Sequence, residues 1–226
     1  MSTPLFFVFL QNHSIPRNEM SDSTTYRQDL KGRIVDMASD LFCSHGIKSV
    51  KMDDIAKRLS ISKRTLYEIF ATKEALLSDV VLLMEQKKRD FLKEVYENSA
   101  DVIEVVVGFY QMQMKGFMEV NPDFFLDLRK YPKLINSLRH NKRERRASAL
   151  SFIERGVKEG FFREDMNYKI VQELADSMGG YVMSSNMYKE YAAVDVFQNL
   201  TLILLRGICT VKGIEKLDSF LKKLNL

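Results

Sequence analysis

Four polar side chains lie close together in the sequence and have the chemistry needed to contact a nucleic acid. They are Lys63, Arg64, Thr65 and Tyr67. Cationic and hydroxyl groups bind phosphate oxygens and base edges, and one arginine can donate two parallel hydrogen bonds to a guanine. Leu66, Ile69 and Phe70 are interleaved with them at helical spacing. The segment therefore predicts a helix with a polar outer face and an apolar underside, although this pattern alone would also fit an ordinary solvated helix.

The residues before this helix predict a second helix that holds it in place. Ile55, Ala56 and Leu59 recur at helical spacing, and the small Ala56 lets a neighbouring helix approach closely. Ser62 is a suitable N-cap for the helix that follows the turn. Residues 52–73 thus predict a helix-turn-helix, a motif whose second helix enters the major groove of DNA.

A wider set of residues around this motif resembles the N-terminal signature of the TetR family, which is named after the tetracycline repressor. The matching residues are Phe42, Gly46, Ile55, Ala56, Ile61, Ser62, Thr65, Leu66, Tyr67, Phe70, Lys73 and Leu76. The resemblance extends over residues 27–80. It implies an N-terminal three-helix DNA-binding domain and a C-terminal helical domain that dimerises and binds a small hydrophobic effector.

Three positions depart from the family pattern. Lys51 stands where a serine or threonine usually caps the second helix and touches a phosphate, and we expect its ammonium to reach phosphate instead. Ser60 replaces the usual turn glycine, which costs about 1 kcal/mol if the residue is left-handed. Ile69 replaces a frequent histidine, so no phosphate contact is assigned to it.

The predicted DNA-binding residues combine positive charge with hydroxyl groups. They are Lys51, Lys63, Arg64, Thr65, Tyr67 and Lys73. Lys63 and Lys73 would neutralise phosphates, the latter at the start of a helix capped by Thr72. Thr65 would touch a base or a phosphate, and Tyr67 a phosphate or a thymine methyl group. Glu68 is ambiguous, because it would either accept from a cytosine amine or remain solvated.

Composition fits an ordinary globular protein of one large or two small domains. The chain has 226 residues, of which 46% are hydrophobic and 28% charged, and its net charge is +4. Between Arg27 and Glu74, ten Lys and Arg stand against seven Asp and Glu, so most of the excess positive charge falls on the predicted DNA-binding part. Cys43 and Cys209 lie in separate apolar segments, which favours two free thiols in the cytoplasm over a disulfide.

The first 20 residues differ in character from the rest. Leu5–Leu10 is strongly apolar, but it is too short to span a membrane and lacks the flanks of a secretory signal. We expect residues 1–20 to be a disordered extension, with Met20 as the true start. The alternative is an N-terminal strand or arm that docks on a partner.

The remainder of the chain predicts helices. Thr25 and Gln28 suggest a capping box at the start of the first helix, and Gly46 ends it. Asp123 would cap a short helix that ends at residues 131–132. The other predicted helices cover residues 72–98, 101–120, 133–159, 167–191 and 194–211, with an amphipathic tail over 214–226. The division that follows is a helix-turn-helix domain over residues 21–72 and an effector-binding, dimerisation domain over residues 73–226.

The segment from residue 101 to residue 120 is apolar nearly all round and predicts a buried central helix. Soft methionine and aromatic side chains on such a helix suit an adaptable apolar pocket, although each one alone fits plain core packing. The candidate effector-pocket residues are Phe109, Tyr110, Met112, Met114, Phe117, Met118, Phe124 and Phe125.

The last long predicted helix is too apolar to face solvent, and the long helix before it contains Gly179 and Gly180. We expect them to form an intermolecular four-helix bundle in a homodimer. The charge run Arg139–Arg146 predicts a solvated helix face, with a second nucleic-acid site as the sharper alternative. The histidines His13, His45 and His140 are scattered, so neither a metal site nor a cofactor is expected.

No motif of a known catalytic type stands out, so we do not expect an enzyme. The sequence predicts an all-α, ligand-responsive regulator that binds double-stranded DNA as a homodimer. We expect it to repress transcription by binding a pseudo-palindromic operator. A helical small-molecule carrier or interaction protein without operator binding is the alternative.

Overall fold

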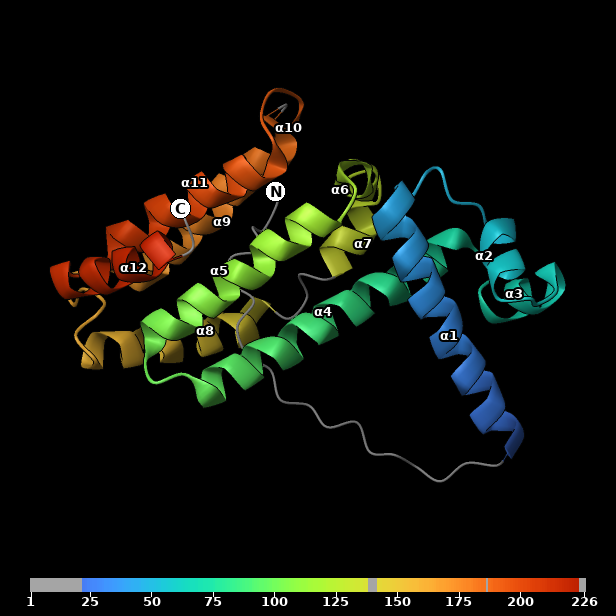
Figure 1. Ribbon diagram of the computed structural model, residues 1–226, viewed down its shortest axis with the longest axis horizontal. Coiled ribbons are helices and arrows are strands. Elements are labelled where there is room, and N and C mark those ends of the chain that lie inside the picture. Colours follow the sequence, from blue (N-terminus) through green and yellow to red (C-terminus); the bar gives the residue numbers. More distant parts are fainter. Residues whose placement is uncertain (1–21, 138–141, 186, 224–226) are drawn as a thin grey trace. The chain divides into compact units, whose positions relative to one another are not determined.

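The computed structural model describes residues 22–137, 142–185 and 187–223, and these residues are predominantly helical (Figure 1). The helices near the N-terminus are α1 (Asp22–His45), α2 (Met52–Arg58), α3 (Lys63–Ile69) and α4 (Lys73–Asn98). They are followed by α5 (Val102–Glu119), α6 (Pro122–Leu128), α7 (Pro132–Ser137), α8 (Lys142–Lys158), α9 (Tyr168–Ser184), α10 (Met187–Glu190), α11 (Ala193–Ile208) and α12 (Val211–Lys223). Within the described residues the β-structure is an isolated bridge between Phe162 and Cys209, so the all-α prediction is confirmed.

The described residues divide into two compact units. The first contains α1 to α3, α4 as far as Lys88, and the segment with α6 and α7. The second contains α4 from Arg89 onward, most of α5, and α8 to α12. The proposed domain division into residues 21–72 and 73–226 is a statement about folding that these contacts do not test, and it stays a prediction.

The first unit is built on α1, as its apolar stripe predicts. Ile34, Ala38 and Phe42 have no exposed surface and pack into the same core as the helix-turn-helix. The end of the helix is also as predicted, since Gly46 adopts φ +80° and donates its N–H to the carbonyl of Phe42 at 2.9 Å. The predicted start is wrong, because the helix begins at Asp22 and so contains Thr25.

Helix α6 belongs to this first unit and is tied to the end of α1. The backbone N–H of Asn121 donates to the carbonyl of Cys43 at 2.7 Å, and Phe124 is 2% exposed in the same core. The N-cap is Asn121 rather than Asp123, since the Asn121 side-chain oxygen accepts the N–H of Asp123 at 2.9 Å. Pro122 takes the first helical position, where its missing N–H costs no hydrogen bond. The N-cap is therefore the residue before Pro122.

The second unit is built around α5, whose burial confirms the prediction for this segment. The α5 residues buried in the core of this unit are Val102, Ile103, Val105, Val106, Val107, Phe109, Tyr110 and Met114. Asp101 starts the helix by accepting the N–H of Ile103 at 2.9 Å, and it pairs with Lys216 of α12. Helix α12 buries Leu217 and Leu221 against this core.

Several predicted helix boundaries in the second half are wrong. The helix predicted to reach residue 191 ends at Ser184, because Ser185 has extended backbone angles that break the ladder. The next helix ends at Ile208, where Cys209 is extended, and the tail helix begins earlier than predicted, at Val211. The helix predicted over residues 133–159 is helical in its described parts, as α7 and α8, and residues 138–141 between them lie outside the described residues.

Some predictions fall outside the described residues. These concern the extension over residues 1–20, the histidines His13 and His140, and the side chains of Arg139–Arg146. Cys43 and Cys209 are both free thiols, as predicted. In the portion of the chain that the structure describes, we find no helix with the length and apolar character required to cross a bilayer.

Candidate nucleic-acid interface

The predicted helix-turn-helix is present as α2 and α3, joined by a tight turn. The turn depends on Ser60, which adopts φ +54° and donates its N–H to the carbonyl of Lys57 at 3.1 Å. Ile61 then donates its N–H to the carbonyl of Ala56 at 3.0 Å. Serine at a left-handed position is strained by about 1 kcal/mol relative to glycine, so the cost foreseen for this residue is incurred.

Ser62 caps α3, as its position predicts. Its hydroxyl oxygen accepts the backbone N–H of Thr65 at 3.0 Å, and the two hydroxyl oxygens lie 2.7 Å apart. This bond satisfies one of the free N–H groups at the start of the helix. The Thr65 hydroxyl is therefore already engaged with the cap, and it must turn away from Ser62 to reach a base or a phosphate.

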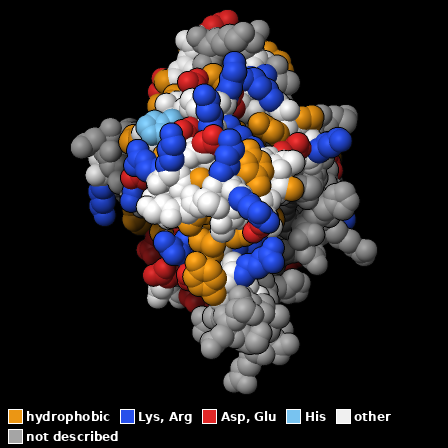
Figure 2. All heavy atoms as spheres, turned by 90° about the vertical axis from the view of Figure 1, so that its right-hand side faces the viewer, with side chains coloured by type: hydrophobic (Ala, Val, Ile, Leu, Met, Phe, Trp, Pro, Cys, Tyr) orange, Lys and Arg blue, Asp and Glu red, His pale blue; other side chains and the backbone are white. Residues whose placement is uncertain are grey.

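Helix α3 has a buried underside and an open outer face. Leu66 is fully buried and Phe70 is 4% exposed, so both anchor the helix in the core of the first unit. On the other side, the Arg64 and Lys63 side chains are 89% and 61% exposed, and Tyr67 is 42% exposed. Figure 2 views this face of the molecule, where Lys and Arg side chains are spread around apolar patches.

Both outward cations form ion pairs with neighbouring carboxylates. The Lys63 ammonium donates to Asp53 of α2 at 2.8 Å, and the Arg64 guanidinium donates to Glu68 one turn along at 2.9 Å. These hydrogen bonds raise the pKa of Lys63 and of Arg64, so both remain charged. Water and salt screen exposed pairs of this kind, so phosphates can replace the carboxylates at little cost.

Lys51 and Lys73 have different surroundings. Lys51 is exposed at the N-cap of α2, where its backbone N–H donates to the Asp54 carboxylate at 2.8 Å. The Lys73 ammonium instead donates to the carbonyls of Ile47 and Val50. Burial lowers the pKa of Lys73, whose ammonium is hydrogen-bonded to these carbonyl oxygens. Lys73 thus fastens the loop between α1 and α2 in this structure, and a phosphate contact from it would have to compete with those bonds.

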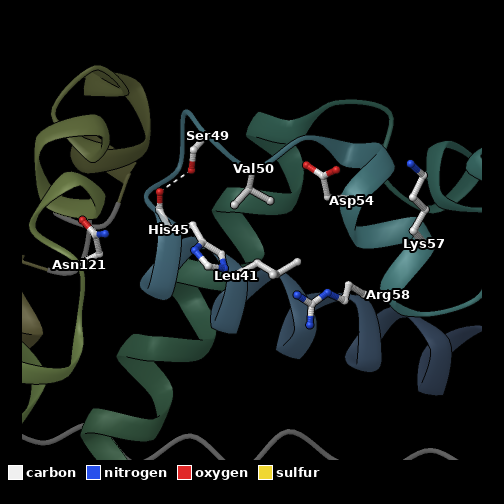
Figure 3. Close-up of a pocket in the computed structure, with 8 residues that line it drawn as sticks. All are labelled: Leu41, His45, Ser49, Val50, Asp54, Lys57, Arg58 and Asn121. Carbon is white, nitrogen blue, oxygen red and sulfur yellow. Dashed lines mark hydrogen bonds between the residues drawn. The ribbon is translucent and has the colours of Figure 1, made fainter.

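A groove beside the helix-turn-helix adds cations that the sequence reasoning missed. It has a volume of about 660 Å³ and lies among the end of α1, helix α2 and Asn121 (Figure 3). Its lining residues are Leu41, His45, Ser49, Val50, Asp54, Lys57, Arg58 and Asn121. Lys57 and Arg58 form the last turn of α2, where positive charge also complements the helix dipole. The adjacent cations Lys57 and Arg58 were the feature of the sequence from which this positive surface could have been predicted.

The candidate effector-pocket residues are not brought together as one group. Phe109, Tyr110, Met112 and Met114 pack in the core of the second unit. Phe124 and Phe125 pack in the core of the first unit, with their rings 5.5 Å apart. Met118 is 74% exposed, and the side chain of Phe117 lies outside the described residues.

Comparison with known proteins agrees with this geometry. Residues 34–80, which contain the helix-turn-helix and the helices beside it, match the model described as bacterial regulatory proteins of the tetR family. Residues 34–80 therefore carry the N-terminal DNA-binding module of the tetR family. The resemblance noted in the sequence, and the function class that it implies, are therefore confirmed.

The TetR-family relatives include proteins described as transcriptional regulators. The chain is 21% identical over 154 residues to the HTH-type transcriptional repressor KstR2 of Mycobacterium tuberculosis, covering 62% of this chain and 73% of that one. It is 32% identical over 98 residues to the HTH-type transcriptional regulator UidR of Escherichia coli, covering 43% of this chain and 50% of that one. A TetR-family regulator from Cytophaga hutchinsonii has the same fold, with a TM-score of 0.59, 18% identity, and coverage of 85% and 99%.

Proposed function

We propose that this protein is a ligand-responsive repressor that binds a pseudo-palindromic operator and releases it when a small hydrophobic effector binds. The outward face of α3 carries this proposal, because its two exposed cations and its phenol stand on a helix whose underside is buried. Such a helix can enter the major groove without disturbing the core that positions it. The TetR-family relatives support the same function class, and they do not favour the alternative of a carrier without operator binding.

The proposal includes a homodimer formed through α9 and α11. On α9 the side chains of Ile170, Leu174 and Tyr181 are 56%, 57% and 67% exposed, and on α11 Ile203 is 62% exposed. Residues 170, 174 and 181 follow one helical stripe, so together they make an apolar surface that a second copy would cover. A symmetric pair would present α3 twice, about one DNA turn or a multiple of it apart.

Effector control requires two arrangements of this dimer with different spacing between the recognition helices. An effector that prefers the released arrangement by about 5 kcal/mol would shift the protein from mostly bound to mostly free. We expect a mainly apolar compound that enters the core of the second unit. Such a regulator would act in the cytoplasm, where its operator is.

The proposal is tested with DNA from upstream of the protein's own gene. Fluorescence anisotropy should show binding that weakens steeply as salt rises, since phosphate contacts release counterions. Lys63→Ala combined with Arg64→Ala should weaken binding by at least tenfold and flatten the salt dependence. The control combines Lys158→Ala with Lys222→Ala, two exposed cations of the second unit, and should bind like the wild type. Equal binding by the recognition-helix variant would refute the assignment of α3.

A further inference from the structure

Three polar groups inside the second unit are buried and have no hydrogen-bond partner among the described residues. They are the hydroxyl of Tyr110 on α5, the side-chain amide nitrogen of Gln172 on α9 and the hydroxyl of Thr201 on α11. The three residues are 3%, 4% and 1% exposed. A buried polar group without a partner is costly, and native cores contain few of them. Three in one compact unit indicate that something beyond the described residues completes them.

Two of these groups lie on helices α5 and α11, which meet in this core. The Tyr110 ring stacks on the ring of Phe197, with centroids 6.5 Å apart and planes 22° from parallel. Thr201 follows Phe197 by four residues on α11, and Leu205 continues the same buried stripe. Residues four apart on a helix have Cβ atoms about 6 Å apart, so Thr201 stands one turn along α11 from the ring that contacts Tyr110.

Gln172 is buried on α9, whose residues Tyr168 and Val171 pack against the same core. Helices α9 and α11 pack together, and the short α10 connects them, so they run in opposite directions (Figure 1). Along α9, Ala175 and Val182 are buried on the same side as Gln172. The exposed apolar stripe of α9 lies on its other side, so Gln172 is separate from the proposed dimer surface.

We propose that Tyr110, Gln172 and Thr201 form the polar lining of the effector site, and that the effector is a neutral, mainly apolar molecule with a carbonyl or hydroxyl oxygen. This inference rests on the proposed function, which requires an effector in this unit. The amide nitrogen of Gln172 can only donate, so it needs an acceptor such as a carbonyl oxygen, whereas each hydroxyl can donate or accept. Phe109, Met114 and Phe197 supply the apolar surroundings.

The charge of the surroundings narrows the ligand class. Among the described residues, the buried polar and charged side chains include no lysine or arginine. A carboxylate or phosphate placed beside Tyr110 would therefore lose its hydration without gaining a counterion, which is strongly unfavourable. Burial also raises the pKa of Tyr110, so its phenol is protonated at neutral pH and can donate a hydrogen bond.

The first test asks whether these groups lack partners in the free protein. Tyr110→Phe, Gln172→Leu and Thr201→Val should leave the thermal midpoint unchanged or raise it by about 2–4 °C. The matched controls are Tyr168→Phe, whose hydroxyl donates to the Arg163 carbonyl at 2.5 Å, and Thr210→Val, whose hydroxyl donates to the Gly160 carbonyl at 2.8 Å. Both controls should lower the midpoint. If the three variants lose stability as the controls do, the groups are already satisfied and the proposal fails.

The second test uses three probes with one carbon skeleton: 1-tetralone, tetralin and tetralin-1-carboxylate. We expect 1-tetralone to raise the thermal midpoint of the wild type more than tetralin does, and the carboxylate to have no effect. The double variant Tyr110→Phe with Gln172→Leu should respond equally to the ketone and the hydrocarbon. Equal shifts in the wild type, no shift with the ketone, or a ketone preference that survives in the variant would each overturn the proposal.

DNA binding separates this inference from the proposed function. Without any probe, the three variants should bind upstream DNA as tightly as the wild type, because none of them lies in the first unit. If the wild type does not bind DNA, the proposed function fails, but the probe and stability results still decide whether the polar site exists. If DNA binding is normal and the ketone preference is absent, only the present inference fails.

Discussion

At the scale of single residues, the two outward cations of α3 are each paired with a nearby carboxylate. Glu68 pairs with Arg64 and Asp53 pairs with Lys63, and all four side chains are exposed. In the proposed complex, DNA would exchange these carboxylates for phosphates or bases, so the acids would lower affinity for a sequence that offers no replacement contact. Selectivity at this surface would then depend on which carboxylates the operator displaces or uses.

Glu68→Gln tests this reading of the surface. Removing one negative charge beside Arg64 should strengthen binding to random-sequence DNA by roughly two- to fivefold, because the carboxylate no longer competes with phosphates for the guanidinium. Anisotropy at low and moderate salt would measure the gain. Glu215→Gln, at an exposed position of α12, should change nothing. A weaker complex of Glu68→Gln with random DNA would show that the carboxylate does not oppose binding.

Ser60 is the second residue whose behaviour can be predicted. Its φ of +54° suits glycine, so Ser60→Gly should raise the free energy of unfolding by about 1 kcal/mol. Ser151→Gly, on the exposed face of α8, should lower it, because glycine weakens a helix interior. Urea unfolding measures both changes. A loss of stability in Ser60→Gly would mean that the serine makes a compensating interaction in the turn.

At the scale of elements, the sequence predicted the short helix α6 but not the core against which it packs. Its docking depends on contacts between residues distant in the chain, such as the Lys48 N–H donating to the Asp127 carboxylate at 2.6 Å. The caps at Ser62 and Thr72 were predictable because their signals are local. No local pattern showed that Lys73 would bind two loop carbonyls, or that Gln172 and Thr201 would be buried without partners. Those features exist only once helices pack.

The anchoring role of Asp127 gives a prediction about acid stability. Burial tends to raise the pKa of Asp127, but its hydrogen bonds with Lys130 and with the Lys48 backbone lower the pKa by a larger amount. The pKa of Asp127 therefore lies below its usual value. The folded state therefore gains stability from ionised Asp127 above pH 4, and loses it as the pH falls through the depressed pKa. Asp127→Ala should cost about 1–3 kcal/mol at pH 7 and less under acid conditions.

Urea unfolding at pH 7 and in strongly acidic buffer, well below the usual carboxyl pKa of about 4, would measure that difference. Asp123→Ala is the matched control, since Asp123 is an exposed carboxylate on the same helix, and it should have a small effect at both values. A cost for Asp127→Ala that does not shrink in acid would show that the carboxylate stabilises α6 by packing rather than by its charge.

At the scale of the whole molecule, the account requires two copies. Leu174 is 57% exposed in the middle of the apolar stripe of α9. Leu174→Asp should convert the dimer to a monomer, because the interface would have to bury a charge, and light scattering after gel filtration measures the mass directly. Leu82→Asp, at a leucine that is 50% exposed on α4, should remain dimeric. A wild type that is monomeric at micromolar concentration would remove the symmetric pair from the mechanism.

Hydroxyl-radical footprinting of the protein on DNA from upstream of its own gene asks whether two copies of α3 contact the operator. We predict two protected segments whose centres lie about one helical turn of DNA, roughly 34 Å, or a multiple of it apart. Both segments should vanish together in the variant that combines Lys63→Ala with Arg64→Ala. A single protected segment, or a footprint that this variant preserves, would contradict the account.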